Sequence, residues 1–88
     1  MTSYDFEKAA KEALISTIEE KYGEKYGIEN ISMVWFAHIL GYKKAILIDD
    51  GDNKRIYEVT YSLTNDQMYV DVYEKQLNKA VSPARRGM

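Results

Sequence analysis

The single histidine, His38, has the clearest capacity for chemistry, because an imidazole titrates near neutral pH. Acid–base catalysis would need a partner within hydrogen-bonding distance. On the strand pairing expected below, Glu58 shares a cross-strand row with His38 but stands two strands away, about 10 Å at ordinary strand spacing. We therefore expect a partly exposed strand histidine and no catalytic residue.

Acidic residues gather in one short segment, which reads Asp49-Asp50-Gly51-Asp52-Asn53. This run resembles a fragment of a calcium-binding loop. The complete twelve-residue loop also needs a late bidentate glutamate and two flanking helices. The segment instead joins two predicted strands, so we interpret it as a polar turn and expect no metal site.

The composition removes several other classes of site. The 88 residues include no cysteine, which excludes disulfides, thiolate nucleophiles and cysteine-ligated zinc. No phosphate-binding glycine loop and no hydrolase or zinc-protease motif occurs. We therefore expect a protein that is not an enzyme and has no cofactor. No apolar run approaches the roughly 18 residues of a membrane span and the N-terminus carries acids, so we expect a cytoplasmic location.

One helix should begin the fold. Apolar side chains recur at three- and four-residue steps between about residues 4 and 22, and Gly23 is a natural left-handed stop. From Ile31 the period becomes two, which predicts strands at about 31–40, 43–49, 54–63 and 67–74. Short connections favour an antiparallel meander, so the fold class is α+β: an N-terminal helix packed on a four-stranded sheet.

The turns fix the expected register. A turn at Gly41-Tyr42, with glycine first, pairs Trp35 with Ile48. A turn at Asn65-Asp66 pairs Leu63 with Met68. A middle pairing of Ile46 with Tyr57 joins the two registers. Together these pairings put one apolar set beneath the helix: Trp35, Ala37, Ile46, Ile48, Tyr57, Val59, Tyr61, Leu63, Met68, Val70 and Val72.

The opposite face of the predicted sheet is also rich in apolar side chains. One helix cannot cover both faces, and an uncovered patch usually marks a partner, a dimer or a cover from the chain itself. Tyrosine is common at binding hot spots because it combines contact area with a polar tip. Seven residues form this candidate interaction face: Phe36, His38, Leu47, Ile56, Glu58, Tyr69 and Tyr73.

The C-terminal residues offer one possible cover. Tyr73, Leu77 and Val81 recur at four-residue steps, which predicts a short helix over 74–81 that Ser82-Pro83 ends. We accordingly expect a single α+β domain over residues 1–81 and a flexible basic tail over 82–88. Cover by this segment and cover by a partner are held as equal alternatives.

The strands also carry an ordered series of motifs: Val34-Trp35, Lys44-Ala45-Ile46-Leu47, Tyr57-Glu58-Val59-Thr60-Tyr61 and Met68 to Lys75. The series resembles a family of small uncharacterised proteins of phages and prophages from Gram-positive bacteria. The resemblance covers roughly residues 4–75 and consists of strand-packing patterns. It implies a protein that acts in the cytoplasm of a bacterial host, and it brings no assigned activity.

The favoured function is a phage- or prophage-encoded protein–protein interaction module that binds a host or phage protein, for instance as an inhibitor of host defence. A homodimer through the same face is included. One alternative is a protein that sequesters a nucleotide-like ligand, with Lys43, Lys44 and Arg55 as the nearby cations. Another is a single-strand nucleic-acid binder that stacks bases on Tyr69 and Tyr73. A net charge of −2 without a basic rim disfavours nucleic acid.

Overall fold

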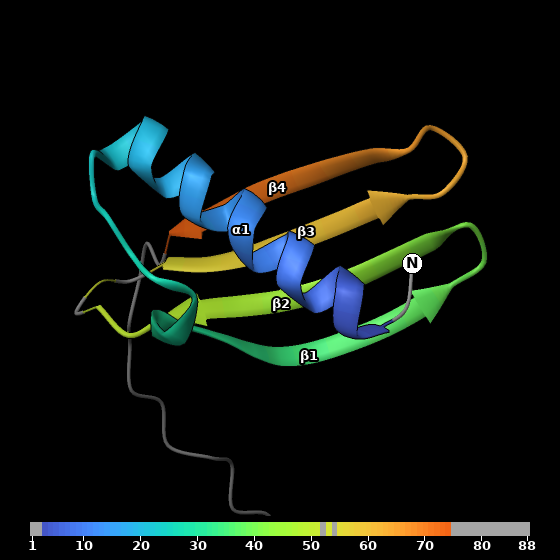
Figure 1. Cartoon of the computed structure of the whole chain (residues 1–88), viewed down its shortest axis with the longest axis horizontal. Helices are drawn as coiled ribbons and strands as arrows, with labels where there is room; N and C mark the ends of the chain where they lie inside the picture. Colours follow the sequence, from blue (N-terminus) through green and yellow to red (C-terminus); the bar gives the residue numbers. More distant parts are fainter. Residues whose placement is uncertain (1–2, 52, 54, 75–88) are drawn as a thin grey trace, which may run out of the picture.

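The protein is one helix laid across one face of a four-stranded sheet (Figure 1). The computed structural model describes residues 3–51, 53 and 55–74. Its elements are α1 (Ser3–Tyr22), the 3₁₀ turn η1 (Ile28–Asn30), β1 (Ile31–Ile39), β2 (Tyr42–Asp49), β3 (Arg55–Ser62) and β4 (Gln67–Glu74). All neighbouring strands pair antiparallel in the order β1-β2-β3-β4. The predicted α+β class and meander are confirmed.

Helix α1 buries one stripe and ends where its sequence predicts. Phe6, Ala10, Leu14 and Ile18 stand four residues apart and are fully buried. Such spacing keeps side chains on one side of a helix. Gly23 then adopts φ +70°, and its N–H donates to the carbonyl of Glu19 at 2.9 Å. This left-handed residue satisfies a carbonyl that the last turn would otherwise leave free, so it fixes the helix end.

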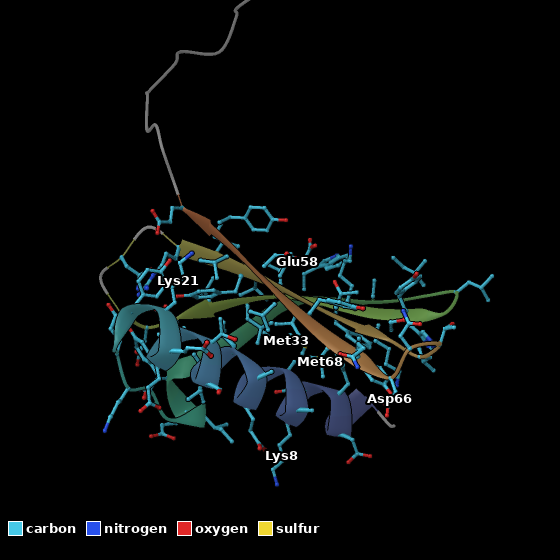
Figure 2. The ribbon with its side chains drawn as sticks, turned by 90° about the horizontal axis from the view of Figure 1, so that it is seen from above. Lys8, Lys21, Met33, Glu58, Asp66 and Met68 are labelled. Carbon is cyan, nitrogen blue, oxygen red and sulfur yellow. The ribbon has the colours of Figure 1, made fainter. Side chains whose placement is uncertain are left out.

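The hydrophobic core lies between α1 and the sheet. The buried stripe of α1 packs with strand residues that are themselves buried, namely Ile31, Ala45, Leu47, Tyr57 and Val59. Met33 and Met68 extend this layer at its sides and lie on the same side of the sheet as α1, whereas Glu58 lies on the opposite side (Figure 2). We call the side toward α1 the helix face and the other side the open face.

The first hairpin turns one residue earlier than expected. The predicted turn at Gly41-Tyr42 is wrong: Ile39 pairs with Tyr42, so the turn residues are Leu40 and Gly41. Gly41 has φ +80° and occupies the second turn position. Glycine suits either position, because a residue without Cβ tolerates positive φ wherever the turn demands it. The earlier turn shifts the register of β1 against β2 by two residues, since Trp35 pairs with Ile46 and not with Ile48, and such a shift preserves side-chain direction.

The middle hairpin exchanges the two faces of β1 and β2, because Ile46 pairs with Glu58 and not with Tyr57, a shift of one residue. Trp35 pairs with Ile46, and Phe36 pairs with Ala45, after a bulge at Val34. The placement of Trp35, Ala37, Ile46 and Ile48 in the core is therefore wrong, and the alternate residues of β2 are buried instead. In β2 both alternating sets are apolar, so alternation alone does not say which set faces the helix.

The last hairpin keeps the predicted faces despite a different register. Residues 63–66 form the turn, Ser62 pairs with Gln67, and Tyr61 pairs with Met68. The predicted pairing of Leu63 with Met68 is wrong by two residues, and Leu63 is exposed. A shift of two preserves side-chain direction. The strand residues predicted to lie beneath the helix from this hairpin do so: Tyr57, Val59, Tyr61, Met68, Val70 and Val72.

Glu74 is the last described residue and ends β4. The expected helix over 74–81, the domain boundary at residue 81 and the tail over 82–88 lie, from residue 75 onward, outside the described residues.

Candidate protein interface

The open face is defined by the alternation of each strand away from α1. Glu58 anchors the assignment, because Figure 2 shows it on the side opposite the helix. The register then places the following strand residues on the same side: Trp35, Ala37, Lys44, Ile46, Ile48, Ile56, Thr60, Tyr69, Asp71 and Tyr73.

One half of the open face is apolar. Trp35 is paired with Ile46, and Ile56 with Tyr73. Continuing the β2–β3 register by one residue sets Ile48 opposite Ile56. Trp35, Ile56 and Tyr73 keep 48%, 50% and 54% of their surface exposed. These five residues form the apolar patch, a contiguous group of large side chains of the kind that marks interaction sites.

The other half of the open face is polar and slightly acidic. Lys44 lies 3.4 Å from Glu58, measured from Nζ to Oε1, and Glu58 pairs across the sheet with Asp71. On the four strands, this face thus presents two carboxylates and one lysine. Both members of the ion pair are partly exposed, so the pair contributes little to stability and mainly shapes the charge of the surface.

The structure divides the seven candidate residues between the two faces. Ile56, Glu58, Tyr69 and Tyr73 lie on the open face, as expected. Leu47 is fully buried and Phe36 packs on Phe6 with ring centroids 5.5 Å apart, so their placement on the second face is wrong. The one-residue shift between β2 and β3 is the cause, because Ile46 pairs with Glu58 and not with Tyr57. Trp35, Ile46 and Ile48 take their place on the open face, and the alternation in β1 and β2, which is apolar on both sides, gives no signal of this.

His38 does not meet an acid–base partner on the open face. It is exposed and pairs with Lys43 across β1 and β2. By strand alternation it shares the side of Phe36, whereas Glu58 is on the opposite side. The expected shared row of His38 and Glu58 is therefore wrong, and the sheet separates the two side chains.

A second cluster of functional groups lies where α1, β2 and β3 meet, and we call it the Arg55 cluster: Tyr22, Glu24, Asp49, Arg55 and Tyr57. Arg55 donates to Glu24 at 2.5 Å, and its guanidinium carbon lies 3.9 Å from the ring centre of Tyr22. Tyr57 donates to Asp49 at 2.5 Å. The side chains of Arg55 and Asp49 are 6% and 1% exposed. Arg55 and Asp49 are thus closed to solvent, whereas Glu24 is exposed.

Asp49 also organises the polar turn that follows it. One carboxylate oxygen accepts hydrogen bonds from the N–H of Gly51 at 2.8 Å and the amide of Asn53 at 2.7 Å. Burial alone would raise the pKa of Asp49, but these bonds, the Tyr57 hydroxyl and the charge of Arg55 outweigh it, so the pKa lies below its ordinary value. Burial, and then donation to Asp49, raises the pKa of Tyr57. The turn interpretation is confirmed for the described residues of this segment.

The polar side chains of the Arg55 cluster form hydrogen bonds with one another. Each carboxylate accepts from a group of the same cluster or turn, and the side chains of Arg55 and Asp49 are buried. The exception is Nε of Arg55, which is buried and has no hydrogen-bond partner in the described part of the chain. We interpret the cluster as an internal ion pair that joins the end of α1 to the sheet.

The placement of the cations bears on the two ligand-binding alternatives. Arg55 is buried in its cluster, and Lys43 is buried on the helix side. Of the three cations considered as anion donors, only Lys44 reaches the open face, and it pairs with Glu58. Tyr69 and Tyr73 are both there, but Asp71 stands between them in β4.

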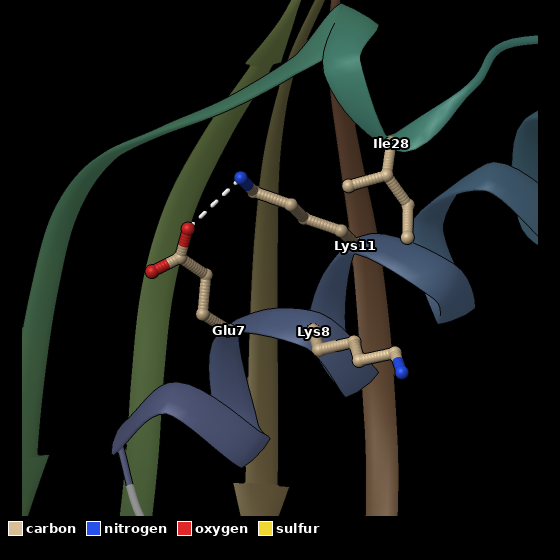
Figure 3. A pocket seen from close by; sticks show the side chains of 4 residues that line it. All are labelled: Glu7, Lys8, Lys11 and Ile28. Carbon is tan, nitrogen blue, oxygen red and sulfur yellow. Dashed lines mark ion pairs between the residues drawn. The ribbon is translucent and has the colours of Figure 1, made fainter.

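A small hollow between α1 and η1 is lined by Glu7, Lys8, Lys11 and Ile28 (Figure 3). Its volume is about 170 Å³, smaller than ordinary ligand pockets of roughly 300–1,000 Å³. Lys11 is paired with Glu7 at 2.9 Å, one helical turn apart. We interpret this hollow as a surface groove between two elements, in which the charged side chains of Glu7 and Lys11 pair with each other.

Comparison with known proteins adds a family and no close relative. The model of a family of unknown function, DUF6275, matches residues 7–83. No curated protein and no solved structure matches the chain. Within residues 3–51, 53 and 55–74, no three histidine, cysteine or acidic side chains come together as metal ligands. No helix in the described part of the chain has the length and apolar character to cross a bilayer.

Proposed function

Because the chain belongs to DUF6275, a family of unknown function, we propose its function from the open face: a non-enzymatic protein–protein interaction module. One observation carries the proposal, the half-exposed Trp35 with large apolar neighbours on the sheet face that α1 leaves uncovered. The partner is a protein surface that presents apolar side chains to this patch.

The energetics favour contact over exposure. Burying apolar surface yields about 25 cal/mol per Å². Trp and Tyr are enriched at binding hot spots, where a few central residues supply most of the affinity. A stable interface of this kind buries on the order of 1,200–2,000 Å² in total. The apolar patch would supply its centre, and the Lys44–Glu58 pair with Asp71 would form its polar rim.

We propose a bacterial setting for this partner. The motif series over residues 34–75 resembles phage and prophage proteins, and this resemblance is the support for a phage-encoded protein in the bacterial cytoplasm. The partner would then be a host or phage protein, and inhibition of a host defence protein is one role of that kind. A second copy of the chain is a further candidate partner.

The two ligand-binding alternatives have less support. A nucleotide-like ligand or a nucleic acid needs cations or free backbone donors for its phosphates. Lys44 is the cation on the strands of the open face, and Glu58 and Asp71 lie near it. We therefore favour a protein partner.

The test compares retention of proteins from bacterial cells by three tagged forms of the chain. Ile56→Glu places a charge in the apolar patch, and Lys8→Glu, on the exposed outer surface of α1, is the control. We expect a defined protein that wild type and Lys8→Glu retain and Ile56→Glu loses, with all three forms folded by circular dichroism. Equal retention by the two variants would refute a role for the open face.

A further inference from the structure

We propose that, in the absence of a partner, residues 75–83 of the same chain pack on the open face over the apolar patch. The inference rests on the proposed function, because the open face would bind both the partner and this segment. The partner would therefore have to displace the segment. Four observations support it, and they concern the exit of the chain, its length, its spacing of apolar residues and its charge.

The exit of the chain leads to the open face. β4 ends at Glu74, one residue after Tyr73, which belongs to the apolar patch. On the helix side this end of the sheet is already occupied, because Tyr22 donates to Glu74 at 2.9 Å and stacks on Arg55. The apolar surface that remains within reach is the patch beside Tyr73.

The length of the segment fits the sheet. The family match runs to residue 83, nine residues past the end of β4, so this stretch is part of the family domain. Residues 75–81 as a helix extend about 10 Å, and residues 82–83 in extended form add about 7 Å. Four strands span three spacings, about 14 Å. A segment of this length reaches from β4 to Trp35 on β1.

The sequence of the segment complements the face. Leu77, Ala80 and Val81 stand at positions i, i+3 and i+4, which is the spacing of one apolar helical stripe. Lys75 and Lys79 are its charged residues, and it contains no acid. The open face opposes them with Glu58 and Asp71 against the single Lys44. Apolar groups thus meet apolar groups, and the opposite charges attract at the rim.

The test uses the full chain, which has no cysteine of its own, so one introduced thiol reports one site. Ile56→Cys places the thiol in the apolar patch, and Ser16→Cys places a control thiol on the exposed side of α1. Each is combined with Leu77→Asp/Val81→Asp, or with Gln76→Asp/Asn78→Asp, which adds the same charge off the apolar stripe. The rate of maleimide labelling is measured over a range of protein concentrations, without a partner.

We expect Leu77→Asp/Val81→Asp to speed labelling at position 56 about tenfold relative to Gln76→Asp/Asn78→Asp, because the rate follows the uncovered fraction of molecules. Labelling at position 16 should not change, and protection should be independent of concentration. Equal rates in the two backgrounds, acceleration at both thiols, or protection that grows with concentration would each overturn the proposal; the last would assign the cover to a second copy. Since no partner is present, failure here leaves the retention test of the proposed function intact.

Discussion

The two faces of one strand, β2, show how differently the sheet uses apolar residues. Ala45 and Leu47 point to the helix face and are fully buried beneath α1. Ile46 and Ile48 alternate with them along the strand. They point to the open face and keep part of their surface in solvent. Hydrophobicity is similar on the two sides, so what separates core from contact surface is the presence of α1. The comparison predicts that truncating a side chain on the helix face lowers the free energy of unfolding more than the same truncation on the open face.

The largest effect should come from truncation on the helix face. Leu47→Ala removes a fully buried side chain and should lower the free energy of unfolding by about 2–5 kcal/mol. Ile48→Ala, one residue later on the open face, should cost less than half as much. Urea unfolding followed by circular dichroism measures both. Equal losses would mean that the open face is packed as tightly as the core.

The Arg55 cluster should show the next largest effect, with a dependence on pH. Asp49→Asn replaces an acceptor by an amide beside several donors and should cost about 1–3 kcal/mol at neutral pH. The folded pKa of Asp49 is lowered, so its contribution is complete above the ordinary carboxyl pKa and is lost as pH falls through the folded value.

Unfolding free energies at neutral pH and below about pH 4 check this dependence. Wild type should lose stability over this range, and Asp49→Asn should lose less. Asp50→Asn, an exposed neighbouring carboxylate, is the control and should keep the wild-type slope. The account of the cluster fails if the slope of Asp49→Asn matches that of wild type.

The hairpin turn that sets the register of β1 against β2 can be tested at Gly41. Its φ of +80° is strained for a residue with a Cβ, although no atom lies within 4 Å of the added carbon. Gly41→Ala should therefore cost about 1 kcal/mol, and Gly41→Asn less, because asparagine tolerates positive φ better. Thermal unfolding compares them. A neutral Gly41→Ala would contradict the Leu40-Gly41 turn.

The smallest effect should come from the polar half of the open face. Glu58→Gln removes the partner of Lys44, and a partly exposed pair of this kind contributes less than about 1 kcal/mol. The change in unfolding free energy should be smaller than that of Ile48→Ala. A larger loss would show that Glu58 is buried by a cover stronger than the one proposed.

The elements were predictable from sequence wherever a single signal decides them. The spacing from Phe6 to Ile18 and the stop at Gly23 give α1 almost to the residue. The faces of β3 and β4 were also predictable, because polar residues such as Glu58 and Asp71 alternate with apolar ones there.

The faces of β1 and β2 were not predictable in the same way. Trp35 and Phe36 are neighbours of similar hydrophobicity, and the choice between them depends on the register of β2 against β3, in which Ile46 pairs with Glu58. The Arg55 cluster was missed for another reason. Its members come from residues 22, 24, 49, 55 and 57, and only the packing of α1 on the sheet brings them together.

The most direct test of the binding role of the open face is photo-crosslinking in bacterial cells. A benzophenone amino acid replaces Tyr73 in the apolar patch or, as the control, Lys8 on the outside of α1. We predict a discrete adduct of higher mass from position 73 that Ile56→Glu abolishes, and none from position 8. Adducts from position 8 alone, or none from position 73, would contradict the account.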